Sequence, residues 1–216
     1  MYQAVVFDLD GTLLNTLNEL AYTVNSVLKK YDLPTHPVDD YRRFIGDGVA
    51  TLVWRAVPED WQSGSKYEQI FDEVLVEYGN NLNRFTVIYD GVTELLDELT
   101  ARNIRMAILS NKAHQFMPGV MAQYFTRWQF EYAFGARAGV PVKPDPTSAR
   151  EIAGLMQLSP AEIIYLGDSD VDINTAIGAG MYPVGAGWGL RGKDELVAAG
   201  AAVVLDHPAD LVKLFN

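Results

Sequence analysis

Two carboxylates, Asp8 and Asp10, follow an apolar run near the start of the chain, and Gly11 comes directly after them. The run from Ala4 to Phe7 predicts a buried strand, and the glycine lets the backbone turn sharply at its end. Packing explains these acids poorly, because carboxylates are rarely buried unless they are paired or bound to metal. A turn-forming or helix-capping pair is the weaker alternative. We therefore interpret Asp8 and Asp10 as part of a ligand site at a strand end.

Further polar groups follow a later apolar run, from Arg105 to Leu109. The segment Ser110-Asn111-Lys112 offers a small hydroxyl and backbone N–H groups, which suit a phosphate oxygen, although a helix N-cap is a more frequent use of serine. Lys143 lies in a loop before Pro144, where its ammonium would balance a phosphate and a carboxylate. A solvated loop lysine is the alternative.

The segment from Gly167 to Asp172 again ends an apolar run and adds three acids. Asp168 and Asp172 are four residues apart, so they lie on one side of a helical turn that starts here. Carboxylate ligands without cysteine favour a hard cation such as Mg²⁺. Acids that only complement a helix dipole are the alternative.

Short apolar runs alternate with helical patterns, which predicts a mostly parallel sheet covered on both faces. The predicted strands are Ala4–Phe7, Arg105–Leu109, Tyr132–Phe134, Ile163–Leu166, Pro183–Val184 and Ala202–Leu205. A helix is expected from Val92, with Asp90 as its cap, and another ends at Gly178 to Gly180. The acids, the hydroxyl and the lysine then meet at one end of the strands, and this convergence defines the site.

Residues 16–85 interrupt this alternation. Apolar residues recur there at helical spacing, at Leu17, Leu20, Val24 and Leu28, and further helical patterns follow. No segment of this region has the pattern of a strand. We predict a helical insertion placed directly after the first strand, with domain boundaries at 1–15 and 86–216 for the α/β core and 16–85 for the insertion.

Composition narrows the function. The 216 residues carry a net charge of −11, which argues against nucleic acid as a partner, whereas a local cation site still allows a small phosphorylated metabolite. The absence of cysteine excludes disulfides, thiol nucleophiles and zinc–thiolate sites. Without an export signal or an apolar run long enough to span a bilayer, we expect a cytoplasmic protein that does not bind membranes. Its assembly is expected to be a monomer or a homodimer.

The motifs, in this order, resemble the haloacid dehalogenase superfamily of phosphohydrolases. The resemblance covers essentially the whole chain and depends most on Asp-x-Asp-Gly-Thr at Asp8 and on Gly-Asp-Ser-x-x-x-Asp at Gly167. It implies a doubly wound, Rossmann-like core with an inserted all-helical cap. It also implies a phosphatase that hydrolyses a small phosphomonoester with Mg²⁺ and an aspartyl-phosphate intermediate.

The resemblance also assigns roles to residues. Asp8 is expected to be the nucleophile and Asp10 the general acid and base. Mg²⁺ is expected on Asp8, the backbone carbonyl of Asp10, and Asp168. The phosphoryl group is expected to be bound by Ser110, Asn111, Lys143 and Thr12. Gly167 and Asp172 are expected to support the metal ligands.

Within the superfamily, the segment from Phe44 to Val49 and the segment from Gly91 to Leu96 are similar to phosphoglycolate phosphatases. The candidate anion-binding residues of the cap are Arg42, Arg43 and Arg55, together with Gly46. The alternative is that these arginines are solvated surface residues.

Two rival functions follow from the same residues. A phosphosugar mutase uses both aspartates, but mutases of this group usually carry a histidine early in the first cap helix, where this chain has Leu20. A non-enzymatic binding module commonly loses an acid or the lysine, and this chain retains them. We therefore favour net hydrolysis.

Overall fold

The computed structural model describes residues 1–82 and 84–215. Six parallel strands form one sheet in the order β5-β4-β1-β6-β7-β8. Their bounds are β1 Ala4–Phe7, β4 Arg105–Ala113, β5 Tyr132–Ala136, β6 Ile163–Gly167, β7 Tyr182–Ala186 and β8 Val203–Leu205. The strand order reverses around β1, so the sheet is doubly wound as predicted, and β1 ends at the position where such sheets bind ligands.

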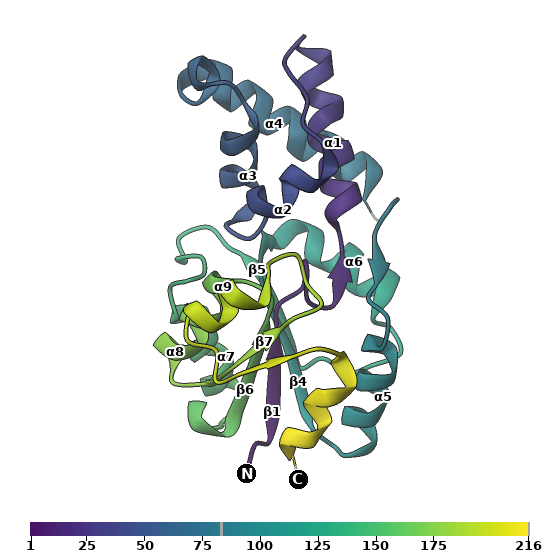
Figure 1. Cartoon of the computed structure of the whole chain (residues 1–216), viewed down its shortest axis with the longest axis vertical. Helices are drawn as coiled ribbons and strands as arrows, with labels where there is room; N and C mark the ends of the chain where they lie inside the picture. Colours follow the sequence, from purple (N-terminus) through teal and green to yellow (C-terminus); the bar gives the residue numbers. More distant parts are fainter. Residues whose placement is uncertain (83, 216) are drawn as a thin grey trace.

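Helices cover both faces of the sheet (Figure 1). On one face, Val5 and Phe7 pack with α5, α6 and η5, and on the other Val6 packs with α7 and α8. The alternation follows from strand geometry, since successive side chains point to opposite faces. The bounds are α5 Val92–Ala101, η3 His114–Phe116, α6 Met117–Tyr124, α7 Thr147–Leu155, η4 Pro160–Glu162, α8 Asp170–Ala179, α9 Lys193–Ala198 and η5 Pro208–Phe215.

The helices that follow β1 lie beyond the carboxyl end of that strand (Figure 1). They are α1 Leu17–Lys30, η1 Val38–Asp40, α2 Tyr41–Phe44, α3 Gly48–Ala56, η2 Glu59–Trp61 and α4 Gly64–Asn81. Their apolar side chains form a separate cluster that includes Val24, Tyr41 and Ile70. This arrangement supports the predicted division at residues 16–85, which stays a prediction. In the described part of that segment, helices and turns account for the regular structure, as expected.

A small ribbon joins the two parts. β2 (Leu14–Asn15) pairs antiparallel with β3 (Val87–Ile88), so the two chain crossings between core and helices are hydrogen-bonded to each other. Glu19 of α1 strengthens this junction, because its carboxylate accepts a hydrogen bond from the Phe85 backbone at 3.2 Å.

Two local predictions differ from the structure. Asp90 does not cap α5: Gly91 occupies the N-cap position with φ +83°, a left-handed conformation that favours glycine. The strand predicted to end at Leu109 runs on to Ala113, with an irregular register after Leu109. The predicted end of α8 is confirmed, because Gly180 forms a left-handed cap. Among residues 1–82 and 84–215, we find no helix long and apolar enough to cross a bilayer.

Candidate active site

Asp8 lies at the carboxyl end of β1 and is only 7% exposed. Its backbone N–H donates to the Leu166 carbonyl at 2.8 Å, which fixes it against β6. Gly11 then turns the chain at φ +96°. A Cβ atom at Gly11 would lie 2.3 Å from Asp168 Oδ2, so glycine is required for the two strand ends to come this close.

Lys143 forms ion pairs with Asp8 at the end of β1 and with Asp172 in α8. Its buried ammonium donates to Asp8 Oδ1 at 2.7 Å and to Asp172 Oδ1 at 2.6 Å. Asp172 is held in turn by Ser169, whose hydroxyl donates to Oδ2 at 2.6 Å in a capping box at the start of α8. Gly167 permits this contact, because a Cβ atom there would lie 2.2 Å from Asp172 Cβ.

Asp168 follows β6 and is almost fully buried. The Leu190 backbone N–H donates to its Oδ2 at 2.8 Å, and the Thr12 hydroxyl donates to its Oδ1 at 3.3 Å. Thr12 is itself fully buried, so in this structure it positions Asp168 and does not line the pocket described below.

Three buried carboxylates therefore lie close together, and the Lys143 ammonium pairs with two of them, Asp8 and Asp172. Each of Asp8, Asp168 and Asp172 offers an oxygen within 4.8 Å of the others. Burial and the neighbouring Asp172 raise the pKa of Asp168 to about 7. Burial also raises the pKa of Asp8 well above its usual range, and Lys143 opposes this only in part. The excess negative charge and the oxygen ligands fit a divalent hard cation.

This electrostatic arrangement predicts a pH-dependent response to Mg²⁺. The pKa of Asp168, about 7 in the folded protein, exceeds its usual value, so the metal-free fold binds extra protons and loses stability as the pH rises from about 4 to 7. We expect Mg²⁺ to bind the ionised carboxylates and to reverse the loss of stability. At 100-fold over its Kd we expect a stabilisation of about 2.7 kcal/mol, or roughly 5–10 °C in Tm, at pH 8.

Thermal unfolding with and without MgCl₂ at pH 8 and pH 5.5 measures this effect. The rise in Tm should be smaller at pH 5.5, where protons compete for the site. Asp168→Asn should abolish the rise, whereas Asp170→Asn, at an exposed position of the same segment, should preserve it. An equal rise in wild type and Asp168→Asn would show that Mg²⁺ binds elsewhere.

Ser110 and Asn111 lie within β4, next to these acids. Ser110 lines the pocket beside Asp8. The Asn111 side chain is already bonded: Oδ1 accepts from the Lys143 backbone at 2.9 Å, and Nδ2 donates to the carbonyls of Lys143 at 3.0 Å and Gly46 at 3.1 Å. Asn111 thus holds the lysine loop and the loop between α2 and α3 in place.

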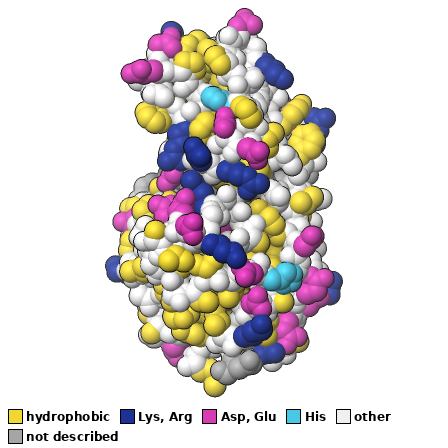
Figure 2. Space-filling model, in the orientation of Figure 1, with side chains coloured by type: hydrophobic (Ala, Val, Ile, Leu, Met, Phe, Trp, Pro, Cys, Tyr) yellow, Lys and Arg dark blue, Asp and Glu magenta, His cyan; other side chains and the backbone are white. Residues whose placement is uncertain are grey.

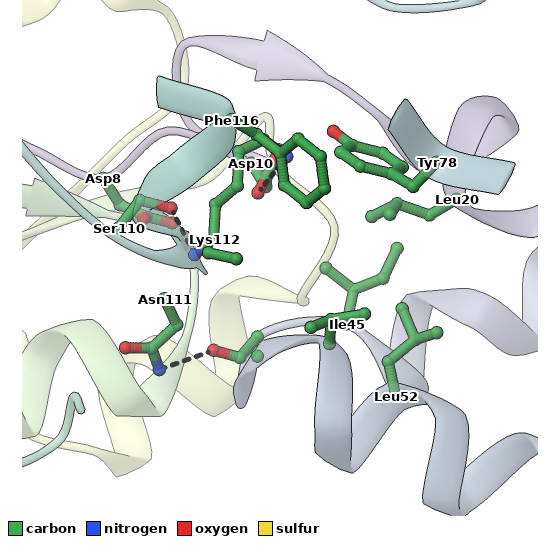
Figure 3. Close-up of a pocket in the computed structure, with 14 residues that line it drawn as sticks. Asp8, Asp10, Leu20, Ile45, Leu52, Tyr78, Ser110, Asn111, Lys112 and Phe116 are labelled. Atoms are coloured by element: carbon green, nitrogen blue, oxygen red, sulfur yellow. Dashed lines mark hydrogen bonds and ion pairs between the residues drawn. The ribbon is translucent and has the colours of Figure 1, made fainter. Parts of the chain in front are cut away.

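A small cavity of about 50 Å³ opens above Asp8 and Asp10 (Figure 3). Ser110 and Lys112 of β4 form one side, and apolar side chains from the helical insertion face them. The apolar lining residues are Leu20, Ile45, Val49 and Leu52 of the insertion and Ala113 and Phe116 of the core, with the Tyr78 ring beside them.

The structure brings Gly46 to this cavity but leaves Arg42 and Arg55 outside its lining. Arg42 lies 3.4 Å from Asp39 on an exposed turn. Arg55 pairs with Asp47 at 2.6 Å. Figure 2 shows Lys and Arg side chains gathered between the helical insertion and the sheet. Arg43 and Arg55 line a second hollow there, of about 440 Å³, together with Arg191 of the core.

Lys112 is a charged pocket residue whose side chain received no role in the sequence analysis, which used only the hydroxyl and backbone N–H groups of its segment. Its ammonium donates to both oxygens of Asp10, at 2.9 and 3.0 Å, and its side chain is 5% exposed. Burial alone would lower its pKa, but Asp10 raises it above the usual range, so Lys112 stays charged. Its place two residues after Ser110, on the same side of an extended strand, is the signal that could have found it.

Comparisons with known proteins place this geometry in a family. Residues 5–186 match the model of the haloacid dehalogenase-like hydrolases. A phosphoglycolate phosphatase of Pasteurella multocida is 31% identical, over 100% of this chain and 99% of its own length. One from Haemophilus influenzae is 29% identical over 99% and 98%.

Solved structures share the fold of this chain. A predicted phosphoglycolate phosphatase from Haemophilus somnus superposes with a TM-score of 0.91 at 28% identity, over 100% of this chain and 98% of that one. CbbY from Rhodobacter sphaeroides, solved with phosphate, shares the fold with a TM-score of 0.80 at 20% identity, over 98% of this chain and 96% of that one. The chain therefore belongs to the haloacid dehalogenase-like hydrolase family, within which it is a phosphoric monoester hydrolase.

Proposed function

We propose that this phosphatase hydrolyses a short phosphomonoester, with 2-phosphoglycolate as the leading candidate, through a phosphorylated Asp8 and with Mg²⁺ as cofactor. The observation that carries the proposal is the Asp8 carboxylate, which lines the cavity, pairs with Lys143 and lies close to two further buried acids. Relatives that cover the whole chain are phosphoglycolate phosphatases, which supports the choice of ester.

The residues divide the reaction into two steps. An oxygen of Asp8 attacks phosphorus, the bond from phosphorus to the leaving oxygen breaks, and Asp10 gives that oxygen a proton. Water then attacks the phosphorus atom and gives a proton to Asp10, and the bond between phosphorus and the Asp8 oxygen breaks. This releases inorganic phosphate and restores both carboxyl groups. Lys143 and the Ser110 hydroxyl offset charge on the phosphoryl oxygens.

The metal has a defined place in this scheme. Asp8, Asp168 and the backbone carbonyl of Asp10 would hold Mg²⁺, and Asp172 would keep Lys143 beside them. When bound, the ion offsets charge on the phosphoryl group. Thr12 and Gly167 support this arrangement through Asp168 and Asp172.

The pocket argues against the mutase alternative. Leu20 lines the cavity at the position where a histidine is expected in a mutase, and its side chain has no proton to transfer. The non-enzymatic alternative is opposed by the intact set of acids and lysine and by membership of a hydrolase family. A cytoplasmic location, the absence of nucleic acid and membrane partners, and a monomer or homodimer as the assembly stay predictions.

A panel of phosphate esters tests the proposal. Phosphate release is measured with and without Mg²⁺ on 2-phosphoglycolate, a hexose phosphate, a nucleoside monophosphate and an aryl phosphate. We expect Mg²⁺-dependent release, with the highest kcat/KM on 2-phosphoglycolate. Isomerisation of a hexose phosphate without release would establish the mutase instead. Inactivity on every ester would overturn the proposed function.

A further inference from the structure

Lys112 carries the one positive charge among the described residues that line the cavity. Apart from Asp10, its neighbours on this wall are aromatic: the ammonium lies 4.9 Å from the centroid of the Tyr78 ring, and Phe116 lines the same wall. Figure 3 shows this group at the side of the cavity away from Asp8. A ligand that enters therefore meets a cation at one defined position, beyond the phosphoryl subsite.

Asp10 and the Tyr78 side chain together engage the ammonium of Lys112. An ammonium has three N–H groups, and the contacts with the two oxygens of Asp10 use two of them. The Tyr78 side chain interacts with the same ammonium. Burial raises the pKa of Tyr78 to about 12, so its hydroxyl keeps its proton at neutral pH and can donate a hydrogen bond to an anion.

The spacing fits a short acid. Ser110, which lines the cavity beside Asp8, and Lys112 are two residues apart on β4, which corresponds to roughly 7 Å along a strand. The wall beside Lys112 is mostly apolar or aromatic, so it offers few hydrogen-bond partners for the hydroxyls of a sugar or the edges of a nucleobase. Arginines of the insertion do not line this cavity, so they do not supply a second cation there.

We propose that Lys112 and Tyr78 together bind a carboxylate on the leaving group, and so select phosphate esters of short hydroxy acids. This inference rests on the proposed function and adds the residues that recognise the acid. It also couples recognition to catalysis, because the same ammonium orients Asp10 beside the leaving oxygen.

A matched pair of substrates tests the assignment. In 2-hydroxyethyl phosphate a neutral CH₂OH replaces the carboxylate of 2-phosphoglycolate. In the wild-type enzyme we expect kcat/KM to favour the acid by about 10- to 100-fold, the usual range for a charge-assisted hydrogen bond. In Lys112→Met the ratio should fall close to 1, mainly through a higher KM for the acid. Since Lys112 also contacts Asp10, kcat should fall for both esters, and the ratio removes this common effect.

Controls separate the outcomes. Lys66→Met removes an exposed lysine of the insertion and should leave the ratio unchanged. Tyr78→Phe keeps the ring and should lower the ratio roughly 3- to 10-fold. Equal kcat/KM values in the wild type, or an unchanged ratio in Lys112→Met, overturn the inference while the proposed function stands. Where Lys112→Met does not fold, Tyr78→Phe tests the assignment, and an unchanged ratio in Tyr78→Phe then overturns the inference. Wild-type inactivity on these esters and on an aryl phosphate overturns both.

Discussion

The Asp8→Asn variant is expected to lose phosphatase activity by roughly 10⁴-fold or more while it remains folded. An asparagine has the shape of aspartate, and its carbonyl oxygen can still accept the hydrogen bond from Lys143 that Asp8 Oδ1 accepts at 2.7 Å. It removes a negative charge from the group of three buried carboxylates, so the metal-free fold should be stabilised, not weakened. The amide is not a nucleophile, and the first step of the reaction stops.

Steady-state release of phosphate from 2-phosphoglycolate at saturating Mg²⁺ measures the loss, and thermal unfolding checks the fold. Asp8→Ala is made in parallel, because slow deamidation of an asparagine would restore an aspartate and mimic residual activity. Asp170→Asn is the matched control, since it carries the same change at an exposed position near the site. Turnover within about 10-fold of the wild type in both Asp8 variants would exclude Asp8 as the nucleophile.

The acids of the site were predictable because the topology alone brings them together. Asp8 and Asp168 each follow an apolar strand, and parallel strands next to each other end at the same edge. Lys143 was harder to place, since it lies in a loop without periodicity. Its position depends on Asn111, which is distant in sequence. The Asn111 side chain binds both the backbone N–H and the backbone carbonyl of Lys143.

The remaining differences arise from long-range contacts. The strand after Arg105 was expected to end at Leu109 because polar residues follow, but Ser110 and Lys112 are buried by the site they form. β2 and β3 are two residues long, so only their pairing with each other reveals them. Arg55 was considered for anion binding on its charge alone, and its partner Asp47 is recognisable only when α3 and its preceding loop are folded.

The second large effect is expected for Lys143→Met. The ammonium is the partner of both Asp8 and Asp172, and its side chain is 3% exposed. Methionine keeps much of the length of the side chain but leaves two buried carboxylates unpaired. We expect a loss of about 3–5 kcal/mol in the free energy of unfolding, as for other buried pairs broken from one side. Activity should fall at least about 100-fold, because the charge on the phosphoryl oxygens is no longer offset.

The pH dependence distinguishes this electrostatic cause from a packing defect. Lys143 lowers the pKa of Asp8, so its removal raises that pKa further, and the carboxyl group is neutral over a wider pH range. The loss of stability in Lys143→Met should therefore be largest near pH 8 and shrink towards pH 5, where protonation replaces the missing cation. Thermal unfolding of wild type and variant across this range measures the difference.

A double variant tests the same electrostatic cause independently of pH. Asp172→Asn removes one of the two carboxylates that Lys143 neutralises, and its one carbonyl oxygen can still accept the hydrogen bond from the Ser169 hydroxyl. Added to Lys143→Met, it should recover part of the lost stability, since fewer buried charges lack a partner. It should recover no activity, because the phosphoryl group still has no ammonium beside Asp8. A stability loss that is equal at pH 5 and pH 8, and additive in the double variant, would mean that Lys143 acts through packing and not through its charge.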